Sequence, residues 1–277
     1  MSTFWQRYKR NKSAVFGLAV IIIVIIMAAT ANFLYPFDPF RLAGKPLSGP
    51  GMNGFWLGSD SLGRDVAAGI VHGAKTSLLI GLIATLVAIF IGIVFGAFAG
   101  YYGGRLDDIL MRITEIFQTI PSFIFAILLV AIMKPSIVSI VIAIAVVSWP
   151  GVARLVRGEF LALKNREFVQ ACHTLGMNDL RIMLREILPN CMSPIIVIGS
   201  LMVATAILIE SGLAFLGLGD PNIMSWGFQI GAGRTMLRSA WWVFTFPGVA
   251  ILITVLAINL VGEGLNDALN PRLRERN

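Results

Sequence analysis

One acidic side chain stands out among the residues that could do chemistry. Glu210 is the only acid deep in the last third of an apolar stretch. An ionisable group at such a position is a candidate for an ion or proton site. Glu210 also lies directly before the glycine-rich residues 211–221, where a side chain could cap a turn. The sequence favours this structural role over a chemical one.

Two other patterns suggest chemistry but fail on their spacing or placement. Residues 69–76 resemble a phosphate-binding loop, but an alanine separates the glycine from Lys75, and the motif requires the two to be adjacent. A membrane-embedded protease would need a histidine partner or metal ligands. His72 and His173 are the only histidines, and the distribution of charge places them on opposite sides of a membrane. We therefore predict no catalytic residue, no metal site and no cofactor bound by this chain.

The composition places most of the chain in lipid. Of its 277 residues, 57% are hydrophobic and only 13% are charged, about half the charged share of a soluble domain. The charges cluster and leave apolar windows that are each long enough for a spanning helix of roughly 20 residues. We therefore predict an all-α membrane protein with six transmembrane helices. The windows lie between Lys12 and Asp38, Lys75 and Arg105, Glu115 and Lys134, Lys134 and Arg154, Glu186 and Glu210, and Arg238 and Glu263.

The net charge is +7, and the distribution of the positive residues along the chain indicates the orientation of the protein in the membrane rather than binding to nucleic acid. If the N-terminus is cytoplasmic, fifteen of the 22 lysines and arginines fall inside and seven fall outside. The positive-inside rule then places both termini in the cytoplasm. The apolar run 14–31 has about 18 residues, which is longer than the apolar core of a secretory signal. We therefore predict that the first helix stays attached, although residues 29–31 resemble a cleavage site.

The windows divide the chain into three parts. Residues 1–76 hold a cytoplasmic tail, the first helix and a proline-punctuated periplasmic segment, which favours extended structure. Within this part, residues 66–75 are expected to lie along the outer interface. Residues 77–266 form a core of five spans with one long cytoplasmic segment, 153–190. Residues 267–277 form a cytoplasmic tail.

Three glycines in the second window recur every four residues. Gly92, Gly96 and Gly100 would form one stripe on a helix. Small residues so placed let a neighbouring helix approach closely. We predict that this stripe packs against another helix of the same chain.

The long cytoplasmic segment carries the most informative pattern. It indicates a helix, a break at Gly176 and a second helix that Pro189 ends. A helix that projects from a membrane can sit in a groove of a partner protein, and glycine permits the sharp reversal. Taken alone, an ordinary connecting loop explains the pattern equally well. Cys172 and Cys191 flank this cytoplasmic loop, where thiols stay reduced, so we expect no disulfide.

The same segment resembles the docking loop of permease subunits of ABC importers. That loop reads EAA, three residues, glycine, about nine residues and I-x-L-P. Four positions match here, while a glutamine replaces the acid, a cysteine replaces the second alanine and Glu186 stands in place of the isoleucine. The resemblance assigns these residues to an ATPase-docking loop: Gln170, Ala171, Cys172, Gly176, Leu188 and Pro189.

Further stretches resemble the dipeptide/oligopeptide/nickel permease family over nearly the whole chain. Residues 57–65 are similar to its L-G-T-D-x-x-G-R-D signature, and 153–159 to its approach to the docking loop. Residues 215–219 with 225–227 resemble its F-L-G-L-G and S-W-G pattern. Residues 270–274 resemble its D-P-R-L-R tail, with asparagine in place of aspartate, which is typical of the C-type permease. The resemblance marks a periplasmic motif of Gly58, Asp60, Gly63, Arg64 and Asp65, and an outer-face turn of Glu210, Gly217, Gly219 and Trp226.

The resemblance implies a type I ABC importer permease fold in the bacterial inner membrane, without enzymatic activity of its own. Such a chain forms half of the pathway for a small solute, with di- or oligopeptides expected first and nickel complexes, glutathione or another small solute as alternatives. Expected partners are a second homologous permease, two ATPase subunits or domains that hold ATP and magnesium, a periplasmic or lipid-anchored substrate-binding protein, and the bilayer. A secondary transporter or ion channel is the rival class. It would couple through intramembrane charges, which the span interiors almost lack.

Overall fold

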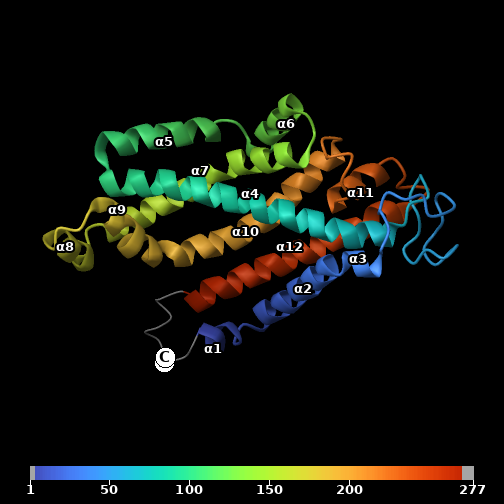
Figure 1. The fold of residues 1–277 in the computed structure, drawn as a ribbon, viewed down its shortest axis with the longest axis horizontal. Helices are drawn as coiled ribbons and strands as arrows, with labels where there is room; N and C mark the ends of the chain where they lie inside the picture. Colours follow the sequence, from blue (N-terminus) through green and yellow to red (C-terminus); the bar gives the residue numbers. More distant parts are fainter. Residues whose placement is uncertain (1–3, 270–277) are drawn as a thin grey trace.

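The computed structural model describes residues 4–269, and every regular element in that range is helical. Figure 1 shows long helices lying side by side along the long axis of the molecule. The short helix α8 lies at one end, and the irregular residues 35–65 lie at the other. The elements are α1 (Phe4–Tyr8), α2 (Lys12–Ala29), α3 (Ala31–Leu34), α4 (Val66–Tyr102), α5 (Gly104–Gln118), α6 (Ser122–Met133), α7 (Ile137–Leu163), α8 (Glu167–Thr174), α9 (Asp179–Arg181), the π-helix η1 (Ile182–Ile187), α10 (Leu188–Phe215), α11 (Trp226–Gly233) and α12 (Trp241–Leu269).

The structure contains up to six candidate spans in its described part. Five helical segments are long and apolar enough to cross a membrane: α2, α4, α7, the continuous run Asp179–Phe215, and α12. The sixth candidate is the pair α5 and α6, which is bent by 81° at a short break. Counting this bent pair as one span gives the six that the sequence predicts. The all-α fold is confirmed.

The third predicted window, between Glu115 and Lys134, is not one straight helix. α5 ends at Gln118, and α6 begins only at Ser122. Pro121 lacks an amide proton and disfavours helical backbone in the residue before it, so it separates the two helices. The window thus combined the end of one helix with α6, whose 12 residues are too few to cross a bilayer alone.

The second span begins earlier than predicted. Residues 66–75, expected along the outer interface, are the first turns of α4. The Asp65 carboxylate starts this helix by accepting the Ala67 amide at 2.8 Å. α11 covers these turns, and a Cβ on Gly73 would lie 3.0 Å from the Trp226 side chain. Protein contacts, rather than the membrane surface, therefore surround the start of α4.

A stripe of glycines joins α4 to α7. Gly92, Gly96 and Gly100 are buried. A Cβ on Gly92 would lie 2.5 Å from the Val152 Cβ, and one on Gly100 would lie 2.6 Å from the Phe160 Cβ. Only glycine permits this approach between two helix backbones. The stripe therefore lies against α7 rather than against lipid.

α2 lies along α12, as Figure 1 shows. Gly17 faces that helix, and a Cβ there would lie 2.8 Å from the Ala257 carbonyl oxygen. The other face of α2 exposes a row of large apolar side chains, Ile22, Ile23, Ile25 and Ile26. An exposed apolar face of this kind suits contact with lipid.

Candidate functional site: a docking loop and an outer-face turn

The segment between α7 and α10 folds into a short helical hairpin. α8 ends at Thr174, and Gly176 follows with a φ of +70°. The Gly176 amide donates to the His173 carbonyl at 2.9 Å, and the Met177 amide donates to the Cys172 carbonyl at 3.1 Å. These two hydrogen bonds form a Schellman cap, whose left-handed residue is usually glycine because a Cβ would be strained there. Gly176 thus stands at the turn between two helical pieces.

The second piece does not end at Pro189, which corrects the prediction. It continues through α10 as one helical run to Phe215. Before the proline, η1 adopts π-helical hydrogen bonding, and the Leu188 amide donates to the Met183 carbonyl. In a π-helical segment each carbonyl accepts from the amide five residues later rather than four. The carbonyl four residues before Pro189 therefore does not depend on the amide proton that proline lacks. The hairpin is therefore continuous with a spanning helix.

The residues predicted for docking lie on two faces of the hairpin. Cys172 and Leu188 pack inward, against a buried apolar cluster that includes Val169 and Ile187. Cys191 belongs to the same cluster, and both cysteines are free thiols, as expected. The other four predicted residues are exposed: Gln170, Ala171, Gly176 and Pro189.

Leucines and arginines gather on the exposed side of the second helical piece. Leu180 and Leu184 are 51% and 53% exposed. Together with Asn178, Arg181 and Arg185 they line a shallow groove, and we call these five residues the docking face. Apolar side chains flanked by arginines, at the end of a membrane protein, fit a partner with an apolar groove and an acidic rim.

Glu210 secures the start of α11 at the opposite end of the molecule. Its carboxylate is 1% exposed and accepts the Ser225 hydroxyl at 2.7 Å. The Ser225 oxygen in turn accepts the Phe228 amide at 3.0 Å, so it is the N-cap of α11. This contact is consistent with the structural role that the sequence favours, and it supports the start of α11 rather than the glycine-rich turn.

The glycine-rich turn after α10 closes itself. Gly217 has a φ of +85°. Its amide donates to the Ala214 carbonyl at 2.9 Å, and the Leu218 amide donates to the Leu213 carbonyl at 2.9 Å, which is a second Schellman cap. Gly219 lies close beside Ala214, because a Cβ added to Gly219 would lie 2.9 Å from the Ala214 Cβ.

Trp226 anchors α11 to α4. The indole is fully buried and donates to the Ile70 carbonyl at 2.9 Å. The backbone amide of Trp226 donates to the Ser77 hydroxyl at 3.2 Å. α11 also packs against α10 and α12, so this short helix is largely covered by protein, whereas residues 215–217 and 221–223 of the preceding turn are exposed.

The charged residues of the periplasmic motif shape the turn before α4. One Asp60 carboxylate oxygen accepts the amides of Leu62 and Arg64, each at 2.8 Å. The Arg64 guanidinium lies over the Phe40 ring, 4.9 Å from its centroid. Burial raises the pKa of Asp65 above its ordinary value, while hydrogen bonds from the amides that follow it oppose that shift.

The glycines of the same motif allow the loop to touch its surroundings. Gly58 and Gly63 have φ values of +86° and +78°. A Cβ on Gly58 would lie 2.6 Å from the Trp242 indole nitrogen, and one on Gly63 would overlap the Gly44 carbonyl. Trp242 also donates to the Ser59 carbonyl at 3.1 Å. The motif therefore fixes the loop before α4 against α12.

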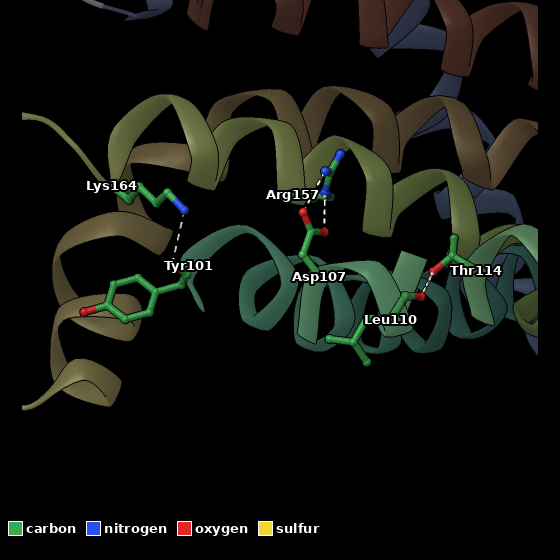
Figure 2. A network of polar contacts seen from close by, with 6 residues as sticks. All are labelled: Tyr101, Asp107, Leu110, Thr114, Arg157 and Lys164. Carbon is green, nitrogen blue, oxygen red and sulfur yellow. Dashed lines mark hydrogen bonds and ion pairs between the residues drawn. The ribbon is translucent and has the colours of Figure 1, made fainter. Parts of the chain in front are cut away.

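An ion pair ties α5 to α7 near the hairpin, as Figure 2 shows. Arg157 donates from Nε to Asp107 Oδ1 at 2.6 Å and from Nη2 to Oδ2 at 2.7 Å. A two-point contact of this kind fixes the relative orientation of its partners. In the same view, Lys164 Nζ donates to the Tyr101 carbonyl oxygen at 3.4 Å.

These elements have the arrangement of a known group of transport proteins. Residues 92–275 match the family described as "Binding-protein-dependent transport system inner membrane component". The chain belongs to this family. Residues 1–48 of this inner-membrane component also match the N-terminal transmembrane domain of oligopeptide transport permease C. The family resemblance read from the motifs is confirmed, while the tail motif at 270–274 lies outside the described residues.

Several characterised permeases are similar to this inner-membrane component over almost their whole length. The di/tripeptide transport system permease of Pseudomonas aeruginosa is 40% identical, over 99% of this chain and 93% of its own. The dipeptide transport system permease of Bacillus subtilis is 42% identical, over 98% and 85%. The glutathione transport system permease of Pectobacterium atrosepticum is 39% identical, over 98% and 91%.

A solved structure shares the fold. The MetNI methionine ABC transporter in an inward-facing conformation matches with a TM-score of 0.60 and 18% identity, over 73% of this chain and 96% of the other. At this level of identity the match supports the fold alone. It confirms the type I importer permease architecture that the sequence resemblance implies.

Sequence reasoning missed the polar residues that connect helices at the hairpin end of this inner-membrane component. Asp107 and Arg157 lie 50 residues apart in the chain, and Tyr101 and Asp179 lie 78 apart. A single sequence shows no link across such distances. The sequence did offer one indication, because all four residues lie in or beside the segments that it predicts to be cytoplasmic.

Replacing Asp107 with alanine should loosen α5 from α7. The change removes both hydrogen bonds of the ion pair and leaves Arg157 without its carboxylate, which should lower the free energy of unfolding by about 2 kcal/mol. Thermal unfolding of the purified subunit in detergent measures this loss. Asp108→Ala is the matched control, because the Asp108 side chain is exposed, accepts no hydrogen bond within residues 4–269 and acts on Arg157 only through its charge. Equal melting temperatures for the two variants would contradict the prediction.

Proposed function

We propose that this chain is the permease subunit of an ABC importer and forms half of the translocation pathway for dipeptides or short oligopeptides. One observation carries the proposal. The hairpin that bears the docking face is continuous with a spanning helix, through Asp179–Phe215. A push on the hairpin therefore moves a membrane-crossing helix directly, as a subunit driven by a soluble motor requires.

The proposed assembly divides the work among several proteins. The docking face and the exposed Gln170, Ala171 and Gly176 bind an ATPase subunit, and two such subunits or domains hold ATP and magnesium. A second homologous permease completes the pathway. A periplasmic or lipid-anchored binding protein delivers solute to the periplasmic loop and outer-face turn. This chain is not itself an enzyme, and both of its termini lie in the cytoplasm, as the charge bias of the loops supports.

The proposed cycle uses the two ends of the molecule in turn. Closure of the ATPases on ATP draws the hairpins together, and α7 and α10 carry this motion through the membrane. The pathway then changes from inward-open to outward-open. Hydrolysis releases the hairpins and returns the pathway to the inside.

Short peptides are the proposed solutes because the similar permeases of Pseudomonas aeruginosa and Bacillus subtilis are named for di- and tripeptides. The glutathione permease relative is nearly as similar, at 39% identity. Glutathione, itself a tripeptide, is therefore the second candidate. The residues that choose between them lie in the binding protein and along the pathway.

Uptake by the reconstituted assembly tests the proposal. The vesicles contain both permeases and the ATPases, and a binding protein loaded with labelled dipeptide is added outside. They should accumulate the label only when ATP is present on the side of the membrane where the ATPases lie. A protonophore should leave the rate unchanged. Accumulation that needs a proton gradient and ignores ATP would instead support a secondary transporter.

A further inference from the structure

Tyr101 contacts both halves of the hairpin from the last turn of α4. Its hydroxyl donates to Asp179 Oδ1 at 2.9 Å. Its ring stacks on the His173 ring with centroids 6.4 Å apart, and the hydroxyl lies 3.5 Å from His173 Nε2. His173 belongs to α8 and Asp179 to α9, so the two partners stand on opposite sides of the Gly176 turn.

The direction of these hydrogen bonds follows from the number of protons. A phenol hydroxyl has one proton to donate, and Tyr101 uses it in the hydrogen bond to Asp179. The contact with His173 therefore requires the imidazole Nε2 to be the donor. The Lys164 ammonium, just after α7, donates to the Tyr101 carbonyl oxygen (Figure 2). One residue thus meets the ends of α7, α8 and α9 from α4.

Tyr101 links the hairpin to a helix that does not lead into it directly. α7 leads into the hairpin and α10 leads out of it, whereas α4 continues into α5. α8 packs chiefly against η1, and nothing surrounds the position of a Gly176 Cβ. Val169 and Cys172 hold α8 against the buried apolar cluster, and Tyr101 adds a hydrogen bond and a ring contact that together reach both halves of the hairpin.

We propose that Tyr101 is a positioning residue. It holds the two halves of the hairpin against α4, so that a movement of the hairpin also moves the membrane-spanning helices. This inference rests on the proposed docking function. It deepens that function by assigning the transmission step to a residue outside the docking face. The docking face itself remains intact when the Tyr101 hydroxyl is removed.

Tyr101→Phe tests the proposal in the complete reconstituted assembly. It keeps the ring and removes the hydroxyl. Tyr102→Phe is the matched control, because Tyr102 is exposed and its hydroxyl makes no hydrogen bond within residues 4–269. We expect Tyr101→Phe to retain ATPase capture while the ATP consumed per dipeptide imported rises roughly three- to tenfold, the effect of losing one typical hydrogen bond. Amide hydrogen exchange across residues 167–175 should become faster in Tyr101→Phe only.

A pair of substitutions at the acceptor distinguishes positioning from general destabilisation. Asp179→Ala removes the acceptor and should raise the ATP cost per peptide as much as Tyr101→Phe, with no further rise in the double variant. Asp179→Asn keeps a carbonyl acceptor and should stay near the wild-type ratio.

The wild-type assembly separates failure of this inference from failure of the proposed function. Wild-type vesicles that import without ATP would remove the function on which the inference rests. If the wild type is ATP-driven, a Tyr101→Phe ratio equal to that of Tyr102→Phe overturns the positioning role. Loss of ATPase capture in Tyr101→Phe also overturns it, because the residue would then serve docking itself.

Discussion

Gly96→Leu should prevent the subunit from folding to a stable, detergent-soluble form. A Cβ at this position would overlap the Ala153 carbonyl oxygen and lie 2.7 Å from the Val156 Cβ and 3.0 Å from the Arg157 amide nitrogen. Two of these three obstacles are backbone atoms of α7, which cannot move aside as a flexible side chain can. The leucine must push α4 and α7 apart along their shared seam, at a cost of at least about 3 kcal/mol.

Gly151→Leu is the matched control for this substitution. Gly151 belongs to α7, is exposed, and has no atom within 4 Å of its Cβ position. Both variants gain the same side chain and the same helix propensity. Folded yield by size-exclusion chromatography and the melting temperature measure the outcome. A normal yield for Gly96→Leu, or an equal loss in both, would show that the seam does not depend on close backbone approach.

Leu180→Asp should abolish import while leaving the subunit folded. Leu180 is 51% exposed on the docking face, so a polar replacement there creates no buried charge. In the docked assembly the same position would face an apolar groove, where an unpaired carboxylate is costly. Loss of such a contact weakens binding by roughly tenfold or more. Pull-down of the ATPase and ATP-driven uptake measure the two consequences.

Leu42→Asp provides the comparison for Leu180→Asp. Leu42 is 66% exposed in the periplasmic loop, at the other end of the molecule from the hairpin. ATPase capture should be unchanged in this variant. Equal capture by Leu180→Asp and Leu42→Asp would mean that the docking face has been placed on the wrong side of the hairpin.

One amino-acid sequence was enough to predict most of the spanning helices and the class of protein. Lipid offers no partner for backbone polar groups, so each crossing must appear as a long apolar helix whatever its neighbours are. The windows that became α2, α4, α7, α10 and α12 are therefore visible in one sequence. The motifs were visible for a related reason, because turns that need glycine, such as those at Gly176 and Gly217, show it in the sequence.

Local patterns failed where a neighbouring element or an unusual backbone changed the outcome. The window from Glu115 to Lys134 was apolar enough for a span, yet Pro121 divides it into two helices. Pro189 suggested a helix end, yet the π-helical turn before it lets the helix continue. Residues 66–75 suggested an interfacial segment, yet α11 covers them and they became part of α4.

The contacts between helices, and the partners of the isolated charges, became visible only in the folded chain. The sequence shows Glu210 as an isolated acid, whereas the folded chain pairs it with the Ser225 hydroxyl. Asp107 with Arg157, and Tyr101 with Asp179, join residues 50 and 78 positions apart. The physical reason is that burial in lipid is a property of each segment alone, whereas a hydrogen bond depends on two side chains that only the folded chain brings together.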